Sequence, residues 1–211
     1  MSKEDALILW FDELDNNDVA FVGGKNASLG EMHKELGQRG IRVPYGFAVT
    51  ATAYRTFIDA NDLQDKIGAA LDSHDGSDAS LAKTGREIRR LIKGGKLPTE
   101  LEDEIRDAYR RLSKHYKTRN VDVAARSSAT AEDLPEASFA GQQESYLNVS
   151  GERALLNSVR DCFASLFTDR AITYREQKGF DHMQIALSVG IQKMVRSDKG
   201  AAGVMFTVDT E

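Results

Sequence analysis

Apolar residues recur with two different periods along the chain, and these periods predict a mixture of strands and helices. Short apolar runs at residues 7–11 and 146–149 and a period of two over 121–126 predict strands. Apolar positions three or four residues apart predict helices in six segments: 25–37, the stretch after Thr50, 81–92, 99–116, 155–167 and 169–179. The pattern favours an α+β fold in which helices pack on mostly antiparallel strands.

The cleanest alternation lies in residues 185–195, which we expect to form one strand. One face is apolar and the other is small: Ile185, Leu187, Val189, Ile191 and Val195 against Ala186, Ser188, Gly190, Gln192 and Met194. The small face leaves room either for a closely packed helix or for a flat ligand, and both alternatives stay open. After a turn at 197–200, residues 202–208 are expected to return as a partner strand.

The stretch 121–149 combines a strand, a small-residue segment and a glycine turn. Alternation places Arg126 on the face opposite the valines, and residues 127–139, rich in Ser, Ala and Thr, predict a mobile loop that could act as a lid. Gly141 begins a turn before the strand at 146–149, and its backbone amides could meet an anion. An arginine fork beside such amides suits a polyphosphate, although an ordinary hairpin with a solvated connection has the same composition.

A second candidate motif is Gly23-Gly24-Lys25, which precedes the first expected helix. The N-terminus of an α-helix has unpaired N–H groups and a partial positive charge. A lysine in the first turn is therefore unfavourable unless an anion lies against it. The segment is not a Walker A loop, because Asn26 stands where Ser or Thr would follow the lysine. A solvated lysine in a glycine turn is the plainer alternative.

Thr99 and Glu102 are expected to form a capping box for a later helix.

Composition narrows the possible partners. The 211 residues carry a formal net charge of −5 with both signs interleaved, which argues against nucleic acid as a partner. The N-terminal apolar run is too short for a signal peptide or membrane span, so we expect a cytoplasmic protein with no membrane contact. The single cysteine, Cys162, lies in an apolar helical stripe and is expected to be a buried, inert thiol. Four scattered histidines predict no zinc site.

Two motifs give the chain a family resemblance. VGGKNASLGEM and ARSSATAEDLPEASFAGQQESYLNV resemble the nucleotide-binding motifs of the phosphoenolpyruvate synthase (pyruvate, water dikinase) family, and VPYGF matches a further family segment. The resemblance implies an ATP-grasp-type domain, shared with pyruvate phosphate dikinase and rifampin phosphotransferase, in an enzyme that makes phosphoenolpyruvate, AMP and phosphate from ATP, pyruvate and water through a phosphohistidine. It implies catalytic roles at the triphosphate for Lys25 and Arg126. The remaining implied ATP contacts are Gly141, Gln142, Gln143 and Ser145 at the phosphates, and Gln192, Met194 and Val195 at adenine and ribose.

The resemblance also implies that this chain is one part of a longer enzyme. We expect a helix-rich lobe at 1–120 with the GGK motif and a hairpin and helix lobe at 121–211, together forming an N-terminal nucleotide-binding fragment that is inactive alone. Mg²⁺ is implied with ATP, with its ligands outside the fragment, and pyruvate would bind to missing downstream domains. A rifampin phosphotransferase-like enzyme and a non-catalytic nucleotide-binding module remain alternatives, and the oligomeric state stays open.

Overall fold

A computed structural model describes residues 2–130, 133–134, 137–138 and 144–205 of the chain. Its centre is a five-stranded sheet in which all the neighbouring described strands pair antiparallel. The order across the sheet is β1 (Ile8–Trp10), β2 (Gly46–Val49), β7 (Leu187–Lys193), β3 (Val123–Ala129) and β6 (Ser145–Val149). Helices cover this sheet, so the expected α+β class is confirmed.

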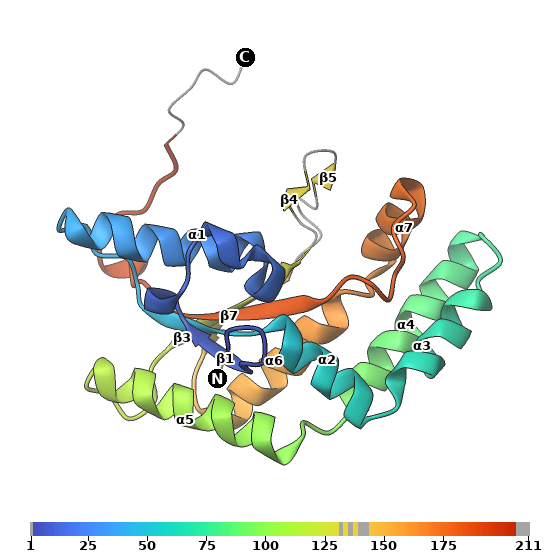
Figure 1. Cartoon of the computed structure of the whole chain (residues 1–211), viewed down its shortest axis with the longest axis horizontal. Helices are drawn as coiled ribbons and strands as arrows, with labels where there is room; N and C mark the ends of the chain where they lie inside the picture. The colour runs from blue at the N-terminus through green and yellow to red at the C-terminus, as the bar shows by residue number, and fades with distance from the viewer. Residues whose placement is uncertain (1, 131–132, 135–136, 139–143, 206–211) are drawn as a thin grey trace.

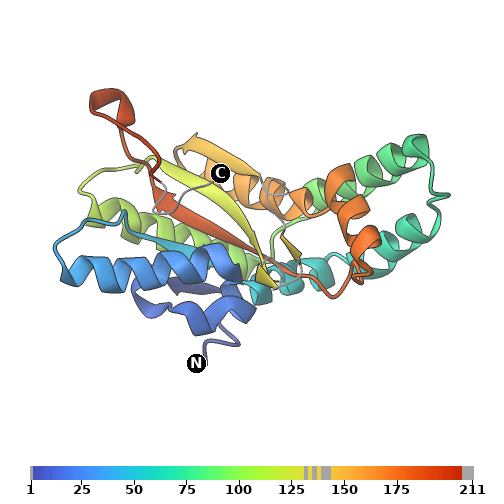
Figure 2. The same cartoon turned by 90° about the horizontal axis from the view of Figure 1, so that it is seen from above.

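Helices lie on both faces of the sheet and beyond one of its ends. In order they are α1 (Val19–Gln38), α2 (Ala51–Ala60), α3 (Leu63–Asp72), α4 (Asp78–Gly94), α5 (Thr99–His115), α6 (Glu152–Ser165) and α7 (Asp169–Lys178). Helix α1 lies over one face, whereas α5 and α6 lie on the other (Figure 1). Helices α3, α4 and α7 extend past the end of the sheet, as the view from above shows (Figure 2). Within the described ranges, no helix has the length and apolar character needed to span a bilayer.

The main hydrophobic core lies between the sheet and helices α2, α5 and α6. It takes apolar residues from one face of each central strand, including Phe47 of β2, Val123 of β3 and Ile191 of β7, all fully buried. A smaller core lies under α1 and the short turns before it: Leu9, Phe11, Leu14, Val22, Ala27 and Ala48. Strands from residues 1–120 and from 121–211 thus share one sheet and one main core, and the division into two lobes stays a prediction.

Helix α1 is broken at Gly23. The backbone there has φ 71° and ψ 162°, a conformation that glycine adopts without the steric cost that a side chain brings. The chain is already helical from Val19, so the expected start near Lys25 corresponds to the second helical segment of α1 rather than to its beginning. Lys25 therefore lies in the first turn after the break.

Strand β3 is longer than the sequence pattern predicts. It continues to Ala129, so the expectation that a mobile loop begins at residue 127 is wrong for residues 127–129. Small side chains at these positions pair with β7 and are buried, because close strand pairing leaves little room for larger ones. The described residues beyond them form a two-stranded hairpin, β4 (Asp133–Leu134) with β5 (Ala137–Ser138), on the side of the sheet that carries α1 (Figure 1).

Two other expectations about local structure were wrong, and one helix was not predicted. Residues 202–205 are not a strand, and residues 206–208 lie outside the described residues. Pro98 is the N-cap of α5 and makes no side-chain cap bond, so Thr99 is the first helical residue and the expected capping box is not formed. Helix α3 was missed, because the expected helix after Thr50 ends at Ala60 and a short turn separates it from α3.

Candidate functional site

Arg126 lies in the middle of β3 on the face of the sheet that carries α1. Its neighbours Val123 and Ala125 point into the main core, whereas the Arg126 side chain is exposed, as the alternation predicts. In register, Arg126 is opposite Gly190 of β7 on one side and Ser145 of β6 on the other. Ser145 is also exposed, so the guanidinium group has a hydroxyl-bearing neighbour on the same face.

The break in α1 lies directly against the end of β3. A Cβ atom placed on Gly23 would overlap the Ser128 hydroxyl and approach the Ala129 carbonyl oxygen to 2.8 Å, so only glycine fits there. The Ser128 Oγ is fully buried and has no hydrogen-bond partner among the described residues. The glycine motif and the Ser-Ser segment after Arg126 are therefore in contact, although about a hundred residues separate them along the chain.

Asn26 fixes the second segment of α1 to strand β7. Its Nδ2 donates hydrogen bonds to the Val22 carbonyl and to Ser188 Oγ, each at 3.0 Å, and the Ser188 hydroxyl donates to the Val49 carbonyl at 2.8 Å. A Cβ atom on Gly190 would overlap the Asn26 amide oxygen. At Ser188 and Gly190 the small face of β7 is therefore covered by a closely packed helix, the first of the two alternatives, whereas a ligand beside Gln192 and Met194 stays a prediction.

This contact brings the two motifs to one place on the sheet. Gly190, under Asn26, is the register partner of Arg126, and Asn26 follows Lys25 directly in the chain. Lys25 is half-buried and Arg126 is exposed. Sequence reasoning identified both cations but missed the residues that position them: Asn26, Ser128 and Gly190. The small residues on one face of the strand indicated a close contact at Gly190, whereas no local sequence pattern predicts the hydrogen bond between Asn26 and Ser188.

The residues expected near adenine lie at the opposite end of β7 from Gly23. The Gln192 side chain is half-buried and donates to the Pro44 carbonyl at 3.1 Å. The Met194 amide donates to the Asp122 carbonyl at 2.9 Å, and the Val195 side chain is 64% exposed just beyond the strand. In the register of the sheet, Arg126 is opposite Gly190, two residues before Gln192 along β7. The residues expected to contact ATP thus lie spread along the sheet rather than in direct contact with one another.

The expected phosphate-binding turn is only partly described. Gly141, Gln142 and Gln143 lie outside the described residues. The Glu144 amide donates to Ser127 Oγ at 3.0 Å, and the Glu144 carbonyl accepts from the Ser127 amide at 3.1 Å. The Glu144 amide is therefore engaged with β3 instead of facing a ligand. Ser145 remains beside Arg126, as described above.

Two other groups bear on the chemistry of the chain. Among the described residues, no cluster of three or more His, Cys, Asp or Glu side chains could hold a metal ion.

Cys162 of α6 is fully buried, and burial raises the pKa of its thiol, because an apolar environment disfavours the thiolate. The expected buried thiol is confirmed. A nucleophilic role for it has no support, since the thiolate is the reactive form.

The fold defines the class: an α+β domain in which one face of an antiparallel sheet carries an exposed arginine and a broken helix. Residues 19–211 match the family model described as "Pyruvate phosphate dikinase, AMP/ATP-binding domain". The chain belongs to this family.

Curated relatives with high identity carry one name. The chain is 57% identical over 212 residues to the phosphoenolpyruvate synthase of Aquifex aeolicus, covering 100% of this chain and 25% of that protein. It is 52% identical over 206 residues to the phosphoenolpyruvate synthase of Escherichia coli K12, covering 97% and 26%. It is 51% identical over 203 residues to the probable phosphoenolpyruvate synthase of Methanocaldococcus jannaschii, covering 96% and 17%. The chain therefore spans about a quarter, or less, of the length of these relatives.

Proposed function

We propose that this chain is the ATP-binding part of a phosphoenolpyruvate synthase. The observation that carries the proposal is the contact between its two motifs, in which Gly23 lies on Ser128 and Asn26 lies on Gly190 beside Arg126. Membership of a family described as AMP/ATP-binding supports nucleotide as the ligand. The name shared by the curated relatives supports the particular enzyme, and their alignment with this chain extends over nearly all of its length.

Lys25 and Arg126 are the residues that we assign to the triphosphate. Two cations on one face suit a polyanion, and the planar guanidinium can hold two phosphate oxygens at once. The residues present fit such a ligand. A helical segment begins after the Gly23 break, and the N–H groups at its start can bind an anion. The buried Ser128 hydroxyl has no hydrogen-bond partner among the described residues. Ser145 and the turn at Gly141, Gln142 and Gln143 complete the phosphate side of the proposal.

Gln192, Met194 and Val195 are the residues that we assign to adenine and ribose. They lie along the end of β7 and the backbone just beyond it, where the exposed Val195 side chain can pack against a flat base. This arrangement would lay the nucleotide along the sheet face, with its base at the Gln192 end and its phosphates towards Arg126 and Lys25.

The complete reaction belongs to a longer protein than this chain. We propose conversion of ATP, pyruvate and water to phosphoenolpyruvate, AMP and phosphate through a phosphohistidine, with pyruvate bound by parts of the enzyme that this chain does not span. Mg²⁺ would offset the phosphate charge, and we assign its ligands to those parts as well. A cytoplasmic location follows from the same proposal.

The test is an activity assay on the full-length gene product. Incubation with Mg-ATP and pyruvate should yield AMP and phosphoenolpyruvate in equal amounts, and omission of pyruvate should abolish phosphoenolpyruvate formation. Rifampin in place of pyruvate should give no phosphorylated product. Phosphorylation of rifampin without phosphoenolpyruvate formation would assign the chain to an antibiotic kinase. Mg-ATP binding with neither product would instead identify a non-catalytic nucleotide-binding module.

A further inference from the structure

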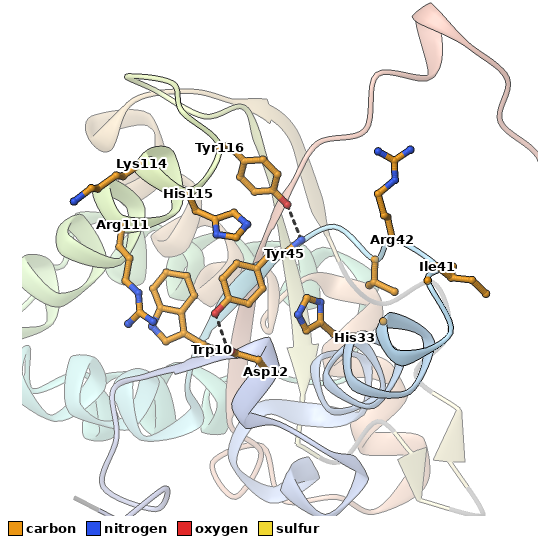
Figure 3. Close-up of a pocket in the computed structure, with 13 residues that line it drawn as sticks. Trp10, Asp12, His33, Ile41, Arg42, Tyr45, Arg111, Lys114, His115 and Tyr116 are labelled. Carbon is orange, nitrogen blue, oxygen red and sulfur yellow. Dashed lines mark hydrogen bonds between the residues drawn. The ribbon is translucent and has the colours of Figure 1, made fainter.

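A cavity lies apart from Arg126, which is not among its lining residues. It is a cavity of about 900 Å³ between the C-terminal ends of α1 and α5 and the β1 side of the sheet. We call it the α1–α5 cavity, and its central residues are Trp10, His33, Tyr45, Arg111, His115 and Tyr116 (Figure 3). None of the residues assigned to ATP lines it, although it borders the Gln192 end of β7, where the Tyr45 carbonyl accepts from the Lys193 amide at 3.0 Å. Its volume is in the range of about 300–1,000 Å³ that is typical of small-molecule sites.

The wall of the cavity is aromatic and held in place. The Tyr45 ring stacks on Trp10 with centroids 5.3 Å apart, and it lies 5.1 Å from each of the rings of His33 and His115. Its hydroxyl donates to Asp12 Oδ1 at 2.7 Å, and its backbone amide donates to the Tyr116 hydroxyl at 2.9 Å (Figure 3). A ring fixed at both ends loses little freedom when a ligand packs against it, which lowers the cost of binding.

Three cations line this cavity. Within the described part of the chain, none of Arg42, Arg111 and Lys114 makes an ion pair, and the Arg111 guanidinium lies 4.3 Å from the centre of the Trp10 ring. Neighbouring arginines of α5 differ: Arg106 and Arg110 both pair with Glu152, at 2.6 and 2.8 Å. Three cations without an ion pair among the described residues therefore lie around one cavity.

Only one carboxylate residue lies among the described lining residues, and it does not neutralise these cations. Asp12 accepts the hydrogen bond from the Tyr45 hydroxyl, and this bond orients the Tyr45 ring. The lining therefore combines flat aromatic surface with guanidinium and ammonium groups whose N–H donors make no ion pair among the described residues. Flat rings pack on aromatic walls, and guanidinium and ammonium groups bind phosphate or carboxylate oxygens.

We propose that the α1–α5 cavity binds an aromatic anion, a small molecule in which a flat ring carries a phosphate or carboxylate group. The ring packs against Tyr45 and His115, and the anionic group lies between Arg111 and Lys114, with Arg42 at the rim. Neither part of the ligand suffices alone, because each cation is exposed and a single charged contact there contributes little. The inference does not depend on the proposed function, since it concerns different residues.

The sequence supplies a reporter for this site. Trp10 is the only tryptophan of the chain, so the intrinsic tryptophan fluorescence of this chain comes from the cavity wall. Titration with phenyl phosphate and with benzoate should each give a saturable change, and whichever binds more tightly identifies the preferred anionic group. Inorganic phosphate tests charge alone and phenol tests the ring alone. Each should need at least about ten times the concentration of the better ligand, a difference of about 1.4 kcal/mol.

Substitutions inside and outside the cavity lining locate the binding. The double variant Arg42→Ala/Lys114→Ala removes two exposed side chains without ion pairs among the described residues, so it should keep the wild-type melting temperature and weaken binding at least about tenfold. Arg126→Ala serves as the matched control and should bind the better ligand as the wild type does. Arg111→Ala changes the surroundings of Trp10, so its affinity is measured by calorimetry and should also fall.

Three results would overturn the proposal. The first is an equal dissociation constant for the wild type and the double variant with an unchanged melt. The second is loss of binding in Arg126→Ala, which would move the ligand to the site proposed for ATP. The third is the absence of a saturable signal from either aromatic anion up to about 10 mM, where even a weak specific site would begin to fill.

Discussion

The two faces of strands β3 and β7 differ in character although their residues alternate along the same backbone. On the face towards α5 and α6, Val123, Val189 and Ile191 are fully buried. On the face towards α1, Gly190 and Ser188 are covered by one helix, and Arg126 next to them is exposed. Neighbouring residues thus serve core packing on one side and a charged surface on the other. Substitutions on the two faces should therefore separate stability from ligand chemistry.

The largest effect is expected from Arg126→Ala, measured in the full-length protein. If Arg126 binds the triphosphate as proposed, loss of the guanidinium removes a positioned charge and should lower phosphoryl transfer from ATP by at least about a thousandfold, about 4 kcal/mol. The melting temperature should stay unchanged, since the side chain is exposed and packs in neither core. Turnover and thermal melting are measured on the same preparations. Normal turnover would remove Arg126 from the site, and a collapsed melt would make it structural.

Ile191→Ala should have the opposite profile. The side chain is fully buried in the main core, so its truncation should lower the free energy of unfolding by about 3 kcal/mol through lost burial and a residual cavity. Urea denaturation of wild type and variant gives this difference. Activity per folded molecule, measured where both proteins are folded, should remain near that of the wild type. A large loss of activity without a stability loss would show that the two faces are not separable as described.

Gly190→Ala tests the contact that joins α1 to the sheet. The added methyl group would overlap the Asn26 amide, so α1 must shift, at an expected cost of about 2 kcal/mol in the free energy of unfolding. Gly68→Ala in α3 is the matched control, because no atom lies within 4 Å of the new Cβ there, and it should stabilise by about 0.5 kcal/mol.

A double-variant cycle sharpens this test. If the clash with Asn26 causes the loss, then Asn26→Ala/Gly190→Ala should be more stable than the sum of the two single effects predicts. Strict additivity would place the strain elsewhere around Gly190.

Cys162→Ala should have the smallest effect. The thiol is fully buried in the main core, and replacing it leaves only a small cavity, so the expected loss is about 1 kcal/mol with unchanged activity. Burial also raises the pKa of the thiol, so a thiol reagent should label the native protein far more slowly than the unfolded one. Rapid labelling under native conditions would contradict the structure at this position.

Local patterns in the sequence were sufficient for the periodic features of the fold. The alternation in 185–195 correctly assigned Val189 and Ile191 to one face, and that in 121–126 placed Arg126 on the other, because strand geometry allows only two faces. Helical spacing likewise predicted that Cys162 is buried.

Features that depend on contacts between distant segments could not be read from those patterns. Asn26 and Ser188 are 162 positions apart, and the break at Gly23 is understood only once β3 lies against it. The end of β3 was misplaced for a related reason, because small residues that look like a loop in isolation are needed where a distant segment of the chain packs closely. The α1–α5 cavity draws on three separate stretches of sequence and has no motif of its own.

The two outer strands of the five-stranded sheet have a consequence for the behaviour of concentrated solutions. Strand β1 has only three residues, and β6 contains an irregularity where Leu147 and Asn148 stand opposite a single residue of β3, with Asn148 at φ 55°. Short and bulged borders are poor templates for intermolecular strand pairing. Neither border of this sheet therefore offers a long, flat row of hydrogen-bonding groups on which a second copy could begin an amyloid-like stack.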